Sequence, residues 1–226
     1  TVELATLEAM GTNAGLTYSM FKPIMMVNSA CAAITVNAKD DRFNTIEDFI
    51  NYAKENEVSM GNSGNGAIWH LAAAGLAKET GAKFKHVAYD GAAGAITDLL
   101  GEHIDAVAVS YAEVANYVES GDLKVLAVMN DKRLDAIPDV PTCKEAGFGD
   151  VVSEPTRGYM LPKGVDAATK AKIDEVFEKA ISDTDHQAEM SNLGLIVDYI
   201  GGDEYLDLLK SQEQDIIALK PELGWE

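Results

Sequence analysis

Short runs rich in β-branched and other apolar residues alternate with amphipathic helical patterns along the chain, and this alternation constrains the fold most. Each run has the length and composition of a strand, and the helices are expected between the strands. The expected strands are Val2 to Ala5, Ile24 to Val27, Ala33 to Val36, Val58 to Gly61, Lys85 to Ala88, Ala106 to Ser110, Val125 to Met129 and Ile196 to Tyr199. The pattern predicts an α/β architecture.

Apolar residues recur at helical spacing in four segments, and each stripe is expected to face a core. Thr45 and Asp48 approximate a capping box before the first helix, which should end near Asn56. Gly81 stands where the second helix would stop. The stripes are Ile46, Phe49, Ile50 and Ala53; Ile68, Leu71, Ala72, Gly75 and Leu76; Ile173, Val176, Phe177, Ala180 and Ile181; and Tyr205, Leu208, Leu209 and Ile216.

The length of 226 residues, 47% of them hydrophobic, allows one large core or two smaller ones. The chain has no internal repeat, no low-complexity segment and no Pro/Ser-rich linker, so a second domain must share the chain by crossing over. Two extended segments, Ile34 to Lys39 and Val151 to Gly158, suit such crossovers. This predicts one lobe from residues 1–37 and 153–226 and a second lobe from residues 38–152.

The charge of the chain excludes some partners, because 37 acidic and 18 basic side chains give a net charge of -19. Such a charge repels nucleic acid and anionic lipid at long range, so no nucleic-acid partner is expected. No run approaches the roughly 18 apolar residues of a membrane span, and Thr1 opens no charged-then-apolar leader. An anionic ligand would need local hydrogen-bond donors.

A glycine-rich turn, Met60 to Ala67, lies between an expected strand and an expected helix. Its glycines allow backbone N–H groups to converge, Ser63 adds a hydroxyl, Asn65 adds an amide, and the helix dipole adds partial positive charge. No Gly-Lys-Ser/Thr follows, so this is not a phosphate-transfer loop. An anion cradle and a plain connecting turn remain equal alternatives at this point.

A second turn, Ala88 to Gly94, also leads from an expected strand into an expected helix. Tyr89 either contacts a ligand, by its ring or its hydroxyl, or forms a wall of the core. Asp90 opposes a purely anionic ligand and is expected to cap the following helix. Arg157 precedes a glycine in the return crossover, where its guanidinium either clamps a carboxylate or makes a surface ion pair.

The residues that usually carry catalysis show no catalytic pattern. No two of the histidines, His70, His86, His103 and His186, have metal-ligand spacing, and none joins a nucleophile motif, so each is expected to be structural. Cys31 and Cys143 are expected to be small buried thiols, with a single bridge as the alternative. The sequence therefore predicts no metal, no cofactor and no enzyme.

An ordered set of motifs covers nearly the whole chain. It comprises Gly61-Asn62-Ser63-Gly64-Asn65-Gly66 with His70-Leu71-Ala72; Tyr89-Asp90-Gly91 with Asp98-Leu99-Leu100-Gly101 and Ile104-Asp105; Gly121 to Val128; Lys132-Arg133; Ile137 to Thr142; and Lys144-Glu145-Ala146-Gly147. In this order the motifs resemble those of the receptor family of tripartite tricarboxylate transporters, the Bug receptors.

The resemblance implies a two-lobed, type II periplasmic-binding-protein fold that closes on a small carboxylate or amino-acid-like ligand and delivers it to membrane permease subunits. It also implies an extracytoplasmic location, in the periplasm or as a cell-surface lipoprotein. The family's ligand loops fall on Thr6, Leu7, Glu8 and Ala9; on Ser63, Gly64, Asn65, Gly66 and Ala67; and on Tyr89, Asp90, Gly91, Ala92 and Ala93. Ser110 and Arg157 are secondary ligand candidates that rest on geometry.

The chain departs from the family pattern at its start and in two turn residues. The family opens with a strand, a glycine-rich loop and a helix, so the first strand-helix unit of the first lobe and the signal region are expected to lie outside this chain. Asp90 replaces a common lysine and Trp69 a small residue or proline, which, with Glu8, favours a ligand bearing an ammonium or aromatic group. The alternatives to a receptor function are the ligand-sensing effector domain of a transcription regulator and an enzyme on the same scaffold.

Overall fold

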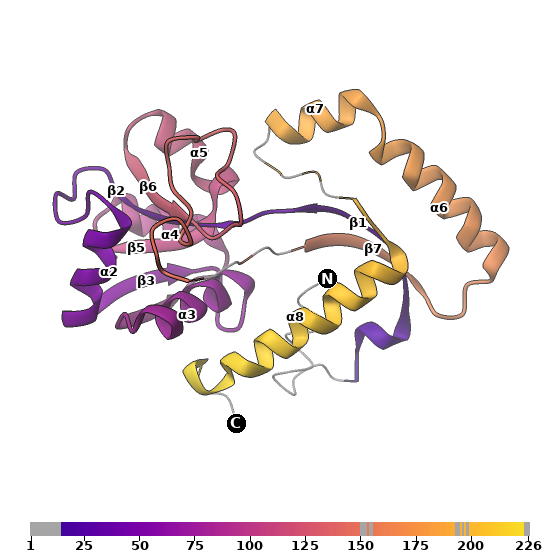
Figure 1. Ribbon diagram of the computed structural model, residues 1–226, viewed down its shortest axis with the longest axis horizontal. Helices are drawn as coiled ribbons and strands as arrows, with labels where there is room; N and C mark the ends of the chain where they lie inside the picture. Colours follow the sequence, from indigo (N-terminus) through magenta and orange to yellow (C-terminus); the bar gives the residue numbers. More distant parts are fainter. Residues whose placement is uncertain are drawn as a thin grey trace. The chain divides into compact units, whose positions relative to one another are not determined.

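The structure is a computed structural model that describes residues 15–149, 153, 156–192, 195, 197 and 199–223 (Figure 1). The chain divides into two compact units. Unit 1 comprises Thr1–Ala30 and Pro155–Glu226, and unit 2 comprises Cys31–Glu154. Each unit has its own β-sheet, so each has its own framework of backbone hydrogen bonds.

Unit 2 has a five-stranded sheet in the order β4-β3-β5-β2-β6. Strand β3 pairs in parallel with β4 and β5, whereas β2 pairs antiparallel with β5 and β6. Every residue of β2 and β5 is buried, which explains their largely apolar composition; the polar members are Thr35, Asn37 and Ser110. The strands are β2 (Ala32–Asn37), β3 (Val58–Asn62), β4 (Phe84–Ala88), β5 (Ala106–Ser110) and β6 (Leu123–Val128).

The position of β2 differs from the sequence-based division. The prediction from the sequence placed residues up to 37 in the first lobe and interpreted Ile34 to Lys39 as a crossover. In the structure β2 has hydrogen-bonded neighbours on both sides, β5 and β6, and its residues therefore belong to unit 2. The division falls between Ala30 and Cys31, before the strand begins.

Four helices belong to unit 2: α2 (Ile46–Glu55), α3 (Ile68–Thr80), α4 (Ala92–Leu100) and α5 (Tyr111–Glu119). The predicted capping box of α2 is confirmed, because the Asp48 N–H donates to Thr45 Oγ1 and the Thr45 N–H donates to Asp48 Oδ2, both at 3.1 Å. Gly81 ends α3 in the left-handed conformation, with φ 73°. The apolar stripe of α2 is fully buried, as expected.

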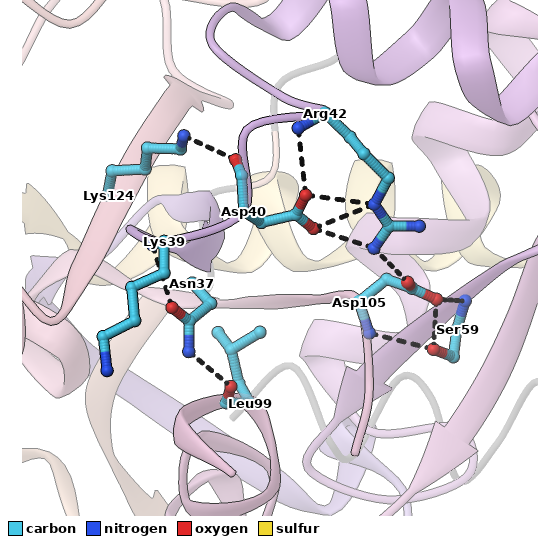
Figure 2. Close-up of polar contacts among 8 residues, drawn as sticks. All are labelled: Asn37, Lys39, Asp40, Arg42, Ser59, Leu99, Asp105 and Lys124. Carbon is cyan, nitrogen blue, oxygen red and sulfur yellow. Dashed lines mark hydrogen bonds and ion pairs between the residues drawn. The ribbon is translucent and has the colours of Figure 1, made fainter. Parts of the chain in front are cut away.

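A charged network joins the loop after β2 to the start of β5 and β3 (Figure 2). Arg42 Nη2 donates to Asp40 Oδ2 at 2.8 Å and to Asp105 Oδ1 at 2.7 Å. Asp105 also accepts the Ser59 N–H at 2.9 Å and the Ser59 hydroxyl at 2.5 Å. Burial opposes ionisation of Asp105, but the hydrogen bonds from Ser59 and Arg42 outweigh it and lower the pKa of Asp105.

Unit 1 has a three-stranded antiparallel sheet in the order β7-β1-β8. One face of β1 packs Ile24 and Met25 against Ile181 of α6, and the other packs Met26 against Tyr205 and Leu209 of α8, so helices cover both faces (Figure 1). The elements are a 3₁₀ turn η1 (Tyr18–Met20), β1 (Phe21–Ser29), β7 (Thr156–Pro162), α6 (Ala167–Ile181), α7 (Thr184–Asn192), β8 (Ile200–Gly201) and α8 (Gly202–Leu223).

Several expectations for unit 1 need correction. The predicted return crossover overlaps β7, which is a paired strand from Thr156. The expected strand Ile196 to Tyr199 falls partly outside the described residues, and its described members, Val197 and Tyr199, lie before the short β8. The expected strand Val2 to Ala5 lies outside the described residues altogether.

The third apolar stripe is only partly a core face. Of its members only Ile181 in α6 is buried, while Val176 is 53% exposed. Tyr205, Leu209 and Ile216 of the fourth stripe are buried as expected. Among the described residues, no helix combines the length and the apolar character needed to cross a membrane.

Candidate ligand-binding site

Three neighbouring strands of unit 2 end at the same edge of the sheet. Strands β4, β3 and β5 are parallel neighbours, and each turns directly into a helix, α4, α3 and α5 respectively. The carboxyl ends of parallel strands are where ligands bind in open α/β sheets. Two of the predicted ligand turns and Ser110 occupy these three positions.

The turn between β3 and α3 leaves several donors unused. Gly64 and Gly66 have positive φ angles of 132° and 74°, which favour glycine. The Gly64 N–H donates to Asn62 Oδ1 at 3.0 Å and the Ala67 N–H donates to Gly64 O at 3.1 Å. Within the described part of the chain, no hydrogen bond engages the N–H or side chain of Ser63 or Asn65. These groups, with the first N–H groups of α3, form a cluster of donors.

His70 stabilises this turn by a hydrogen bond. The sequence predicted a structural histidine but not this contact. The Gly66 N–H donates to His70 Nδ1 at 3.0 Å, and the His70 side chain is buried. The rings of His70 and His86 meet edge to face with centroids 4.5 Å apart. Burial, with the neighbouring His86, lowers the pKa of His70 to about 4, so the ring is neutral at pH 7 and its proton lies on Nε2.

Asn62 is a second residue that sequence reasoning missed. It is the last residue of β3 and is fully buried, and its Oδ1 accepts the Gly64 N–H. Its buried Nδ2 group has no partner in the described part of the chain. A polar residue that ends a buried apolar strand is the signal that could have identified it.

The turn between β4 and α4 lies beside the first turn. The Tyr89 N–H donates to Asn62 O at 3.1 Å, and a Cβ added to Gly64 would lie 3.5 Å from the Tyr89 carbonyl oxygen. The Tyr89 hydroxyl donates to Asp98 Oδ2 at 2.6 Å. Burial and this hydrogen bond raise the pKa of Tyr89 to about 12. The hydroxyl is therefore engaged inside unit 2, and the ring edge and backbone remain for a ligand.

The expected capping role of Asp90 is wrong. The N-cap of α4 is Gly91, which has a φ of 95° and makes no side-chain cap hydrogen bond. Asp90 is exposed at the rim of the turn. Its carboxylate has no hydrogen-bond or ion-pair partner among the described residues, and it follows Tyr89 at the second turn.

Ser110 caps α5 instead of presenting a free hydroxyl. It is 3% exposed, and both its N–H and its hydroxyl donate to Glu113 Oε2, at 2.9 Å and 2.7 Å. A ligand could use only the lone pairs of its oxygen. Arg157 belongs to β7 of unit 1, where Nη1 donates to Asn28 Oδ1 at 3.3 Å. Thr6, Leu7 and Glu8 lie outside the described residues.

The arrangement offers binding chemistry but no reaction chemistry. Among the described residues, no group of three or more His, Cys, Asp or Glu side chains could hold a metal ion. Cys31 and Cys143 are buried and form no disulfide, and burial, with the nearby Cys31, raises the pKa of Cys143 to about 12. Exposed N–H groups at helix N-termini can accept a carboxylate by charge-assisted hydrogen bonds.

The fold is that of periplasmic binding proteins. A solved TctC solute binding protein from Polaromonas is 35% identical, with a TM-score of 0.82, and the match covers 97% of this chain and 75% of that one. The periplasmic binding protein BugD is 26% identical, with a TM-score of 0.86 over 100% of this chain and 77% of its own.

Residues 11–220 match the family model described as "Tripartite tricarboxylate transporter family receptor", and the chain belongs to this family. A UPF0065 protein of Cupriavidus necator is 31% identical over 187 residues, 82% of this chain and 57% of that protein. BugT of Bordetella pertussis is 30% identical over 146 residues, 64% of this chain and 44% of BugT. The chain spans about half the length of the curated relatives it matches. The family is described as a receptor, the Polaromonas protein as a solute binding protein and BugD as a periplasmic binding protein.

Proposed function

We propose that this chain is the ligand-holding part of an extracytoplasmic receptor. It captures a small carboxylate-bearing ligand between two lobes and delivers it to the permease subunits of a tripartite tricarboxylate transporter. The observation that carries the proposal is the donor cluster at the ends of β3 and β4, where Ser63 and Asn65 keep unused donors beside the start of α3. Family membership, not the arrangement of the units, supports lobe closure and delivery.

The electrostatics favour a ligand whose charge is recognised locally. The net charge of -19 repels an anion at long range, so binding depends on short-range donors. Helix N-termini provide such donors together with a positive partial charge that falls off within the first turn. The proposed ligand residues are therefore Ser63, Gly64, Asn65, Gly66 and Ala67, with Tyr89, Gly91, Ala92 and Ala93 on the neighbouring turn.

The exposed carboxylate of Asp90 points to a second charge on the ligand. A carboxylate beside a purely anionic ligand would repel it, whereas a ligand ammonium group would be attracted to it. Glu8, which the family resemblance places in another ligand loop, favours the same chemistry. We therefore propose an amino-acid-like ligand ahead of a dicarboxylate.

The periplasm or the cell surface is the proposed location. The family name and the description of BugD as a periplasmic binding protein support it. The permease subunits are the proposed partners on the strength of the family name alone. Neither nucleic acid nor a catalytic cofactor has a part in this function.

Isothermal titration calorimetry with a panel of amino acids and dicarboxylates tests the proposal. The informative variant is Asn65→Asp, which places a carboxylate in the donor cluster. It is expected to weaken binding of the best ligand by at least about tenfold, because like charges at this distance repel each other. Asn51→Asp is the matched control, because this substitution makes the same change in net charge at an exposed position of α2, outside the donor cluster.

The two variants separate a local effect from a global one. Equal weakening by Asn51→Asp and Asn65→Asp would show that net charge governs binding and would overturn the proposed site. If no member of the panel binds saturably to a full-length receptor form, the proposed function itself fails.

A further inference from the structure

Unit 1 contains a cavity of about 490 Å³ that the proposed function does not use. Its walls come from β1, β7, α6 and α7, and all ten lining residues belong to unit 1. The volume lies within the range of small-molecule binding sites, roughly 300 to 1,000 Å³. The cavity is therefore large enough for a ring-sized ligand.

Part of the cavity lining is apolar and aromatic. The rings of Tyr159 and Phe177 have centroids 4.5 Å apart, and Phe177 packs on the cluster that contains buried Ile181. Tyr159 is nevertheless 50% exposed, and the stripe of α6 expected to be core remains partly uncovered. Exposed aromatic faces at a cavity are suited to stacking on a flat ligand.

The lining also carries a positive charge that has no counter-ion among the described residues. Arg157 donates to the neutral Asn28 Oδ1 at 3.3 Å and has no carboxylate partner in the described part of the chain. The two other arginines, Arg42 and Arg133, each pair with carboxylates. The titratable side chains among the described lining residues are Arg157, Tyr159 and His186.

The described residues of this lining include no acid. The chain has 37 acidic against 18 basic side chains, yet none of the ten described residues that line the cavity is acidic. A guanidinium next to an apolar cavity can bind a carboxylate in a bidentate geometry. Asn28 accepts from only one nitrogen of Arg157, so the other N–H donors of the guanidinium have no partner among the described residues. The cavity is complementary to an anion with an apolar body.

We infer that this cavity is a second small-molecule site, which takes an aromatic monocarboxylate of about the size of benzoate. The carboxylate pairs with Arg157, and the ring stacks on Tyr159 and Phe177 above Ile181. This site lies wholly within unit 1 and does not depend on the proposed donor cluster of unit 2.

Methyl NMR of the whole chain, labelled at isoleucine and methionine methyl groups and titrated with benzoate, tests the inference. The Ile181 and Met190 methyl groups line the cavity and are expected to shift saturably. Ile68, at the start of α3, reports on unit 2 and is expected to stay unchanged. Benzamide, which has the same ring without the charge, is expected to bind at least about tenfold more weakly.

Arg157→Gln is expected to weaken the benzoate-induced shifts by at least about tenfold, while Arg133→Gln, which removes the same charge in unit 2, leaves them unchanged. The inference is overturned if the cavity methyl groups do not respond, if both variants behave alike, or if benzoate shifts only Ile68. The last result would assign benzoate to the donor cluster, so failure here is distinguishable from failure of the proposed function.

Discussion

Gly158 shows how a single residue sets the packing of unit 1. A Cβ at this position would lie 2.5 Å from the Met25 carbonyl oxygen and 2.7 Å from Cζ of Tyr205. Both contacts are far closer than van der Waals distance, and the first is with backbone that cannot rotate away. Only glycine therefore allows β7, β1 and α8 to approach one another as they do.

Gly158→Ala is expected to destabilise the protein by about 1–3 kcal/mol or more, because the added methyl group overpacks the sheet against α8. Gly164→Ala is the matched control, since a Cβ there meets nothing within 4 Å. Urea unfolding measures both. Equal stability of the two variants would contradict the close packing described here.

His70 makes stability depend on pH. The folded-state pKa of about 4 lies below the ordinary value of 6.5, so protons bind the unfolded chain first as pH falls. Stability is therefore fully present above the ordinary pKa and declines as pH falls from 6.5 toward 4. Wild type is expected to lose stability between about pH 7.5 and about pH 5.5. In His70→Gln this loss is expected to be smaller by roughly 1 kcal/mol.

The measurement for His70 is urea unfolding of wild type and His70→Gln at the two pH values. The difference between their pH dependences gives the contribution of His70. A His70→Gln variant that keeps the whole wild-type dependence would show that the ring titrates normally.

At the scale of elements, local patterns predicted most helix ends and helix faces, with one error of each kind: the cap at Asp90 and the stripe of α6. The capping box at Thr45 and Asp48 and the left-handed Gly81 depend on residues within one turn, and both are confirmed. The stripe of α6 was wrong as a core face, because Val176 and Ala180 are exposed and only Ile181 is buried. Amphipathic spacing shows which side chains share a face, but not what covers that face.

Thr45→Ala is expected to destabilise unit 2 by about 1 kcal/mol, because the Asp48 N–H loses its acceptor at the start of α2. Thr97→Ala is the control, since Thr97 is exposed within α4 and alanine is a better helix former there. Thermal or urea unfolding distinguishes the two. An unchanged Thr45→Ala midpoint would mean that water replaces the cap without loss.

The whole molecule is organised by one continuous unit and one discontinuous unit. Unit 2 is a single stretch of chain, and its own backbone closes it: the Ala32 N–H donates to Ser153 O at 3.2 Å, and the Ser153 N–H donates to Met129 O at 3.0 Å. Its sheet core, including Ile34, Met60 and Leu99, is fully buried. Unit 2 therefore has what an independent folding domain requires.

A chain of residues 31–154 is expected to fold alone, with dispersed amide resonances and one cooperative unfolding transition. Two-dimensional NMR and urea unfolding measure this. The fragment 156–223 is the comparison, and it is expected to remain largely unfolded because β7 and α8 lose β1 as their packing partner. An unfolded 31–154 fragment would show that unit 2 depends on the rest of the chain.

The sequence by itself determined the α/β class, most strand positions, the caps at Thr45 and Gly81, and the family, because these depend on periodicity and on neighbours within a few residues. Tertiary structure decided which donors are free. Ser110 is committed to Glu113, Tyr89 to Asp98 and Gly66 to His70, whereas Arg157 lines a cavity and has no acidic partner among the described residues. Residue type states what a side chain can bind, but the folded geometry, even between residues three to nine positions apart, decides whether that capacity is already used.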